Sequence, residues 1–369
     1  MIEKGKITPQ QLSLLMYPYI IATGMLISPF VVSRQADRDL WFSPLFGFIT
    51  GFLAIFLAYK LSRLFPNQTF IEYIPRVIGK VAGKIVAIIY IIFLLQAIAT
   101  ILRENAQFLT GNFFQYTPVP VIMGSILLTA AYNVRSGLEV MCRTAQFTVP
   151  IVLCLVLATC FLNLPTIKPA NILPVFEFGV LPSYKGSFMI QGWLSEFFII
   201  SFLIPYLNKP KKVVRWTAIS ALVVVATLIL INMTCFMILG TSTKAYMYTM
   251  MLLAENISFP GLLNHLEALV MAFWVLATFT KLSVFFYASV LGTAQVFKLS
   301  DYKHIVFPYT ILLLALGQWS LPSTQELFSS IEGYEPFYLF TFNLVIPSII
   351  LLIAIFQKKL KKGIRSRFT

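Results

Sequence analysis

Apolar stretches long enough to cross a membrane recur along almost the whole chain, and they constrain its fold more than any other feature. A helix needs about 20 mostly apolar residues to cross a hydrocarbon core roughly 30 Å thick. Ten such windows lie between charged or proline-rich breaks, the fourth and ninth being short. They cover residues 12–32, 41–61, 85–108, 118–132, 147–164, 187–207, 213–239, 266–291, 305–321 and 337–356. We therefore expect an all-α, polytopic membrane protein of ten transmembrane helices.

The composition excludes the common classes of soluble protein. Hydrophobic residues make up 58% of the 369 residues and charged residues 11%, whereas about a quarter of the residues in a soluble domain are charged. Too few polar residues remain to cover a water-facing globule, and no flexible linker divides the chain. We expect a single transmembrane domain over residues 1–369 and, despite a net charge of +14, no nucleic acid as a partner.

The positive charge is distributed unevenly between alternate loops. With the N-terminus in the cytoplasm, 21 of the 28 Lys and Arg residues fall in cytoplasmic segments and six in external ones, while Lys281 lies within a helix. Cytoplasmic loops are enriched in these residues, and anionic lipid head groups attract them. Both termini are therefore expected in the cytoplasm, as an N-terminal segment at 1–11 and a basic tail at 357–369.

Glycine and small polar residues interrupt the first helix of each predicted half. Thr23 and Gly24 lie near the middle of the first helix, and Gly192, Ser195 and Glu196 near the middle of the sixth. Such residues mark places where a helix unwinds to expose backbone groups to a ligand, and their matching positions indicate a five-plus-five inverted repeat with a mid-membrane site. The alternative is that the glycines allow close packing of a neighbouring helix.

Glu196 and Lys281 are ionisable residues deep within predicted helices. A charge at the bilayer centre costs about 2.5 to 3.5 kcal/mol on insertion scales, so it persists where it faces a cavity or a partner. One interpretation is that the two pair with each other, and another is that they form an interior ion pair that only locks helices together. A further interpretation gives Lys281 the place of the sodium ion of ion-coupled relatives, while Glu196 meets a ligand's ammonium group or takes up a proton. Glu104, beside Arg103 near the end of the third span, is expected to border an entrance rather than form a site.

The sequence carries no pattern typical of an enzyme or a cofactor site. It contains neither a GxSxG nucleophile elbow nor a GxxxxGK[ST] phosphate-binding loop, and its four cysteines and two histidines lack metal-ligand spacing. We expect no catalysis, no cofactor and no metal site.

Five short motifs occur in an order that is similar to a known family. They are residues 6–11 (KITPQQ), 24–29 (GMLISP), 36–41 (ADRDLW) and 171–175 (NILPV), and Glu196 with Pro205. Together they resemble the B subunits of spore germinant receptors, which are ten-helix members of the amino acid/polyamine/organocation superfamily. The resemblance covers essentially the whole chain. The first helix departs from superfamily transporters, because it offers one glycine, Gly24, where amino acid permeases often have several.

The resemblance implies a transporter-like fold in which helices 1 and 6 unwind around a small nutrient such as an amino acid. It also implies sensing in a complex with an A subunit and a lipoprotein C subunit, in the inner membrane of the dormant spore. The residues carried over as the pocket lining come from helices 1, 6 and 8. They are Thr23, Gly24, Ile27, Gly192, Ser195, Glu196, Phe198, Thr280 and Lys281.

Two other functions stay open at this point. A secondary transporter for an amino acid or an organic cation would use the same pocket. A channel subunit of an ion-release complex is a third class, although the spans hold too few polar residues for one chain to line a pore alone.

Overall fold

The computed structural model describes residue 3 and residues 5–255, 266–320 and 323–365, and these residues form helices almost throughout. Within them, β structure is limited to one bridge between Ile7 and Leu207. The longer helices are α1 (Pro9–Ala36), α2 (Ser43–Leu64), α4 (Lys80–Asn112), α5 (Val119–Ser136), α6 (Leu138–Leu162), α9 (Val213–Leu239), α11 (Glu267–Val296), α12 (Val306–Trp319) and α15 (Ile346–Arg365). The shorter ones are α3 (Phe70–Ile78), α7 (Leu181–Gly186), α8 (Phe188–Ser195), α10 (Thr249–Glu255), α13 (Thr324–Glu332) and α14 (Glu335–Phe340).

The ten predicted spans coincide with helical segments of the described residues. Six stretches among these residues are long and apolar enough to cross a membrane, and the first, Pro9–Leu64, contains both α1 and α2. The other five include α4, α6, α9, α11 and most of α15. The remaining predicted spans correspond to α5, to α8 with the helical turns that follow it, and to α12. The all-α polytopic fold is thus confirmed, with residue 321 of the ninth span lying outside the described residues.

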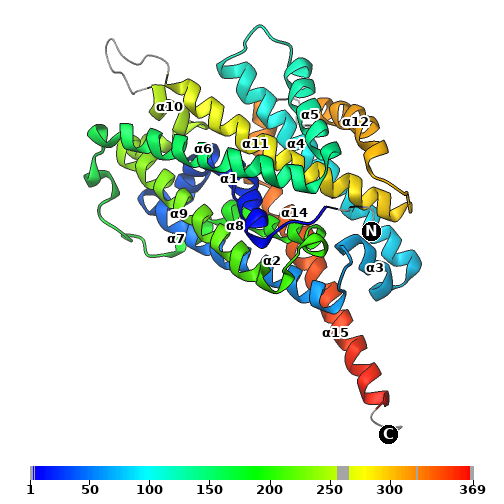
Figure 1. The fold of residues 1–369 in the computed structure, drawn as a ribbon. Helices are drawn as coiled ribbons and strands as arrows, with labels where there is room; N and C mark the ends of the chain where they lie inside the picture. Colours follow the sequence, from blue (N-terminus) through cyan, green and yellow to red (C-terminus); the bar gives the residue numbers. More distant parts are fainter. Residues whose placement is uncertain (1–2, 4, 256–265, 321–322, 366–369) are drawn as a thin grey trace.

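The outer and inner helices differ in what they bury. Peripheral helices carry exposed apolar side chains such as Ile49 on α2, Ile92 on α4 and Phe147 on α6, which suits contact with lipid. α1 is instead buried along almost its whole length. It lies at the centre of the molecule (Figure 1), where it packs against α6, α9 and α11.

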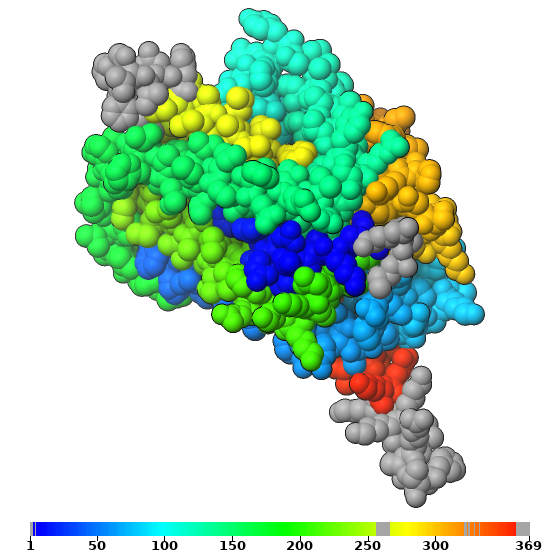
Figure 2. Space-filling view, viewed as in Figure 1, coloured from blue at the N-terminus to red at the C-terminus, as the bar shows by residue number. Residues whose placement is uncertain are grey.

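The N-terminal segment crosses one face of the molecule, as the dark blue band in Figure 2. Its Thr8 and Gln11 form a capping box at the start of α1, because the Thr8 hydroxyl accepts from the Gln11 N–H and the Gln11 amide oxygen accepts from the Thr8 N–H. Just before this box, the Ile7 N–H donates to the Tyr206 carbonyl and the Asn208 N–H donates to the Ile7 carbonyl, both at 3.0 Å. The KITPQQ motif therefore fixes the beginning of α1 and ties it to the end of the sixth predicted span.

The expected break in the first helix is not present, because α1 is continuous from Pro9 to Ala36. The surroundings of Gly24 give the reason. A β-carbon built on Gly24 would lie 3.1 Å from Leu228 Cδ2 and 3.6 Å from a ring carbon of Trp193. This glycine therefore lets α9 and α8 pack closely against α1, which is the alternative given above. The prediction that helix 1 is broken is wrong for this structure.

The sixth predicted helix does change its winding. α8 ends at Ser195, and the chain continues as the 3₁₀ helix η4 over Glu196–Phe202. Gly192 lies before this change and serves packing, since a β-carbon there would lie 3.3 Å from Leu339 Cδ1 and 3.4 Å from Pro336 Cα. A 3₁₀ segment inside a longer helix often marks a functional hinge. Here the change of winding begins at the buried residue Glu196.

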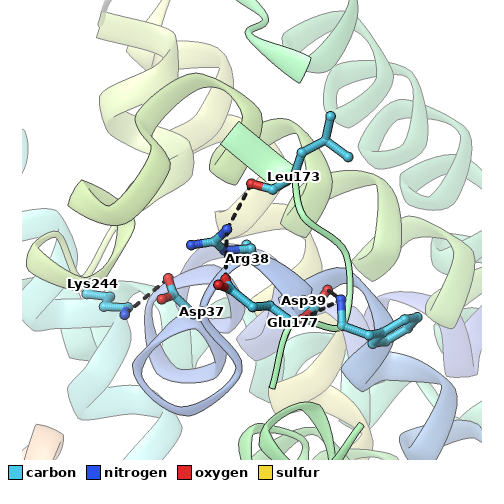
Figure 3. Close-up of polar contacts among 7 residues, drawn as sticks. Asp37, Arg38, Asp39, Leu173, Glu177 and Lys244 are labelled. Carbon is cyan, nitrogen blue, oxygen red and sulfur yellow. Dashed lines mark hydrogen bonds and ion pairs between the residues drawn. The ribbon is translucent and has the colours of Figure 1, made fainter. Parts of the chain in front are cut away.

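Two of the family-like motifs meet in a cluster of charged side chains (Figure 3). We call this cluster the loop clamp, and it consists of Asp37, Arg38, Asp39, Glu177 and Lys244. Arg38 Nη1 donates to the Leu173 carbonyl at 2.8 Å and lies 3.2 Å from Glu177 Oε2. The Asp39 carboxylate accepts from the Phe176 N–H at 3.0 and 3.1 Å, and Lys244 Nζ lies 3.1 Å from Asp37 Oδ1. The ADRDLW and NILPV motifs thus join the α1–α2 connection to the long loop before α7.

Candidate functional site

A small cavity lies where α1, α4, η4, α11, α13 and α14 meet. Its volume is about 40 Å³, which is room for roughly three water-sized spheres. Ionisable, polar and aromatic side chains line it together. The lining residues are Thr23, Phe93, Gln96, Ala97, Thr100, Ile101, Glu104, Glu196, Lys281, Ser330, Tyr334, Glu335, Tyr338 and Leu339.

Lys281 connects three helical segments at one wall of this cavity. Its Nζ lies 2.9 Å from Glu196 Oε2 and donates to Thr23 Oγ1 at 2.8 Å. The side chains of Lys281 and Glu196 are 1% and 5% exposed, so water contributes little to their solvation. The ammonium group also lies 5.8 Å from the ring centre of Tyr19 and 5.9 Å from that of Phe285, within the range of cation–π attraction. We call Thr23, Glu196 and Lys281 the lysine clasp.

Two further carboxyl groups line the same cavity. Glu104, on α4, is only 4% exposed, and Glu335 is the first residue of α14. Among the described residues, neither Oε1 of Glu104 nor Oε2 of Glu335 has a hydrogen-bond partner, and both atoms are buried. The cavity therefore gathers three carboxyl groups, and Lys281 is the cation among the residues that line it.

The backbone around this cluster departs from regular α-helix on two sides. Glu196 opens the 3₁₀ segment η4, and a π-helical turn over Thr341–Val345 separates α14 from α15. On α1, the Trp274 indole N–H donates to the Ala22 carbonyl at 2.7 Å, so a side chain from α11 engages the helix backbone next to Thr23. Irregular winding of this kind is frequent at functional sites.

Three of the nine predicted pocket residues line the cavity, namely Thr23, Glu196 and Lys281. Their mutual contact agrees with the interpretation of Glu196 and Lys281 as a pair. Gly24 and Gly192 are packing positions, as described above.

The other four predicted residues lie away from the cavity lining. Ile27 is fully buried in the apolar core, and the Phe198 ring packs edge-on against Phe70 at 4.9 Å. The Ser195 hydroxyl donates to the Gly192 carbonyl, and the Thr280 hydroxyl donates to the Leu276 carbonyl. Placement in these four cases depends on the direction in which each side chain leaves its helix, which the position within a span does not reveal.

Glu104 and Glu335 line the cavity although neither is among the predicted pocket residues. Glu104 was assigned to an entrance because the third span was expected to end at residue 108, whereas α4 continues to Asn112 and holds Glu104 more deeply. Glu335 lies two residues before the predicted start of the last span at residue 337. A carboxyl group inside an apolar helix was the available signal for Glu104, by the same reasoning that identified Glu196.

Comparison with known proteins assigns the chain to a family. The model of the family described as spore germination protein matches residues 6–321. The chain belongs to this family. The family resemblance inferred from the five motifs is thereby confirmed.

Two proteins from Bacillus subtilis (strain 168) are similar in sequence to this chain. The spore germination protein YndE is 27% identical over 80% of this chain and 82% of its own length. The spore germination protein KB is 24% identical over 97% of each chain.

Solved structures of transporters share the fold. MHP1, a nucleobase-cation-symport-1 family transporter solved in a closed conformation with bromovinylhydantoin bound, aligns with a TM-score of 0.67 at 14% identity, covering 94% of this chain and 78% of its own. MhsT in complex with L-phenylalanine gives a TM-score of 0.66 at 10% identity, covering 96% and 99%. This protein therefore has the five-plus-five inverted-repeat transporter fold and is a multi-pass membrane protein.

Proposed function

We propose that this protein is the nutrient-sensing subunit of a spore germinant receptor and that it binds its ligand, an amino acid, in the central cavity. The observation that carries this proposal is the cluster of Glu104, Glu196, Glu335 and Lys281 around one cavity, in which all but the partly exposed Glu335 are buried. Ionisable groups at such depth are costly unless they serve a ligand, an ion or a partner. The spore germination relatives and the ligand-bound transporter structures support the same reading.

The cavity must enlarge to accept such a ligand. Ligand pockets usually have volumes of roughly 300 Å³ or more, and this one has about 40 Å³. The α13–α14 segment contributes Ser330, Tyr334, Glu335 and Tyr338 and is built from two short helices. Its outward displacement would widen the cavity without unfolding a long helix. In this mechanism the nutrient stabilises one of two arrangements, and the neighbouring subunits respond to the difference.

The proposal also covers the setting of the protein. The chain forms one transmembrane domain over residues 1–369 in the inner membrane of the spore, with residues 1–11 and the tail at 357–369 in the cytoplasm. Its partners are an A subunit, a lipoprotein C subunit and the surrounding lipid.

Germination of spores that lack the gene for this chain tests the proposal. Wild-type and deletion spores are exposed to a panel of single amino acids, and germination is followed as the fall in optical density. We expect the deletion to abolish the response to at least one amino acid, and the wild-type gene supplied in trans to restore it. A deletion strain that responds like the wild type to every compound contradicts a sensing role.

A secondary transporter is the second candidate, because this chain shares its fold with the transporter MHP1 and with MhsT, which binds L-phenylalanine. Uptake of labelled amino acids by the purified protein in proteoliposomes, with and without a proton gradient, separates the two functions. Concentrative uptake without A and C subunits would favour the transporter.

A further inference from the structure

The inference concerns the chemical class of the ligand, and it rests on the proposed function in placing that ligand in the central cavity. Lys281 already has Glu196 and Thr23 as close partners. Glu104 and Glu335 remain as two carboxyl groups facing the cavity, each with a buried oxygen that lacks a hydrogen-bond partner among the described residues. A cation that enters the cavity would supply the missing compensation.

The other lining side chains indicate what kind of cation fits. The aromatic rings of Phe93, Tyr334 and Tyr338 line the cavity with the two carboxyl groups. Carboxylates accept charge-assisted hydrogen bonds from an ammonium group, and aromatic faces attract the same group through their π electrons. A cavity that combines carboxyl acceptors with aromatic rings is therefore suited to bind an organic ammonium ion.

A divalent metal ion fits less well. Such ions in proteins are bound by several oxygen ligands at 2.0–2.6 Å. Among the described residues, no three His, Cys, Asp or Glu side chains lie close enough together to hold a metal ion. The three carboxyl groups of the cavity therefore do not form a metal-binding cluster.

We propose that Glu104 and Glu335 together bind the ammonium group of a primary-amine ligand in the cavity, one from α4 and the other from α14. Glu104 is the fixed half, since it is buried on the long helix α4. Glu335 is the movable half, since it is the first residue of the six-residue helix α14 and is partly exposed. An ammonium group held by both carboxylates links the displaced α14 to α4. The same contact that recognises the amine thereby stabilises the widened cavity, and Gln96, Thr100 and Ser330 remain to contact the rest of the ligand.

The experiment uses the full-length protein purified in detergent and measures the rise in its thermal unfolding temperature. The probes are the 20 proteinogenic amino acids, their N-acetyl derivatives, D-glucose and MnCl2. We expect at least one amino acid to raise the unfolding temperature, and acetylation of its amine to abolish the rise. Glu104→Gln and Glu335→Gln should each weaken the apparent affinity at least about 10-fold. Glu177→Gln, which alters an exposed carboxylate of the loop clamp, is the matched control and should bind like the wild type.

Several results would overturn the amine site. They are no rise with any amino acid, an equal rise with the N-acetyl derivative, a rise with D-glucose or MnCl2 that depends on Glu104, or unchanged affinity in both glutamine variants. If Glu104→Gln does not fold, Glu335→Gln decides alone, because its partly exposed position tolerates the change. The two proposals fail separately: amine binding in vitro with normal germination of deletion spores refutes the sensing role alone, and a germination defect without amine binding refutes the amine site alone.

Discussion

The loop clamp and the central cavity both gather acidic and basic side chains, but they balance these charges differently. In the loop clamp, Arg38 pairs with Glu177, Lys244 pairs with Asp37, and Asp39 accepts from a backbone N–H. The paired side chains there are 26–44% exposed. In the cavity, Lys281 pairs with Glu196 at 1% and 5% exposure, and two more carboxyl groups have no such partner among the described residues.

This difference distinguishes ionisable groups that stabilise the fold from ionisable groups that are available to bind a ligand. An exposed pair gains little, because water already solvates its members. A buried carboxyl without a partner opposes folding, so its retention in an apolar interior calls for a function. The loop clamp therefore fixes loops, whereas the cavity holds carboxyl oxygens without a hydrogen-bond partner among the described residues, which a bound ammonium group would supply.

The largest effect is expected from Lys281→Met. The change leaves Glu196 buried beside two further carboxyls, and removing one partner of a buried pair typically costs about 3–5 kcal/mol. We expect the protein to be nearly lost from the membrane, as measured by immunoblot of membrane fractions.

A double variant is the control for Lys281→Met. Adding Glu196→Gln removes the stranded charge and should restore a large part of the lost abundance, whereas Glu196→Gln should not rescue the unrelated variant Gly24→Val. Equal abundance of Lys281→Met and wild type would mean that the lysine clasp is not charged in the folded protein.

The next effect in size is expected from Gly24→Val. Its β-carbon would lie 3.1 Å from Leu228 Cδ2, inside a packed helix contact, and overpacking costs about 1–3 kcal/mol. We expect a lower thermal unfolding temperature and lower abundance, not a selective loss of the nutrient response. Gly124→Val is the matched control, since no atom lies within 4 Å of a β-carbon built there. A normal unfolding temperature together with a lost nutrient response would indicate that Gly24 lines the binding site.

The contrast between these positions explains which features of the fold and of the site could be predicted from the sequence. The helices follow from hydropathy, because lipid requires long apolar segments whose backbone groups bond within the helix. Glu196 and Lys281 follow from the rarity of ionisable residues at such depth. The direction of each side chain around its helix does not follow, so Gly24, Ile27 and Phe198 could not be separated from Thr23. Glu335 was out of reach for a related reason, since it enters the cavity from outside any predicted span.

A smaller effect is expected from Arg38→Gln in the loop clamp. The change removes the ion pair with Glu177 and the hydrogen bond to the Leu173 carbonyl, which is worth about 1 kcal/mol. We expect a modest fall in unfolding temperature and an unchanged nutrient dose response in spores of matched protein level. A shifted dose response at normal abundance would show that the loop clamp takes part in signalling and does not only fix loops.

The smallest effect is expected from Lys244→Ala. Lys244 and Asp37 lie 3.1 Å apart, but their side chains are 37% and 31% exposed, so the pair contributes at most about 1 kcal/mol and less in salt. Raising the ionic strength from about 0.01 M to about 1 M shortens the screening length from roughly 30 Å to roughly 3 Å. The small difference in unfolding temperature between Lys244→Ala and wild type should therefore vanish at high salt. The difference between wild type and any Lys281→Met protein that can be purified should persist, because ions do not reach the lysine clasp. A difference at Lys281 that also vanishes with salt would mean that the cavity is open to solvent and that its charges behave like those of the loop clamp.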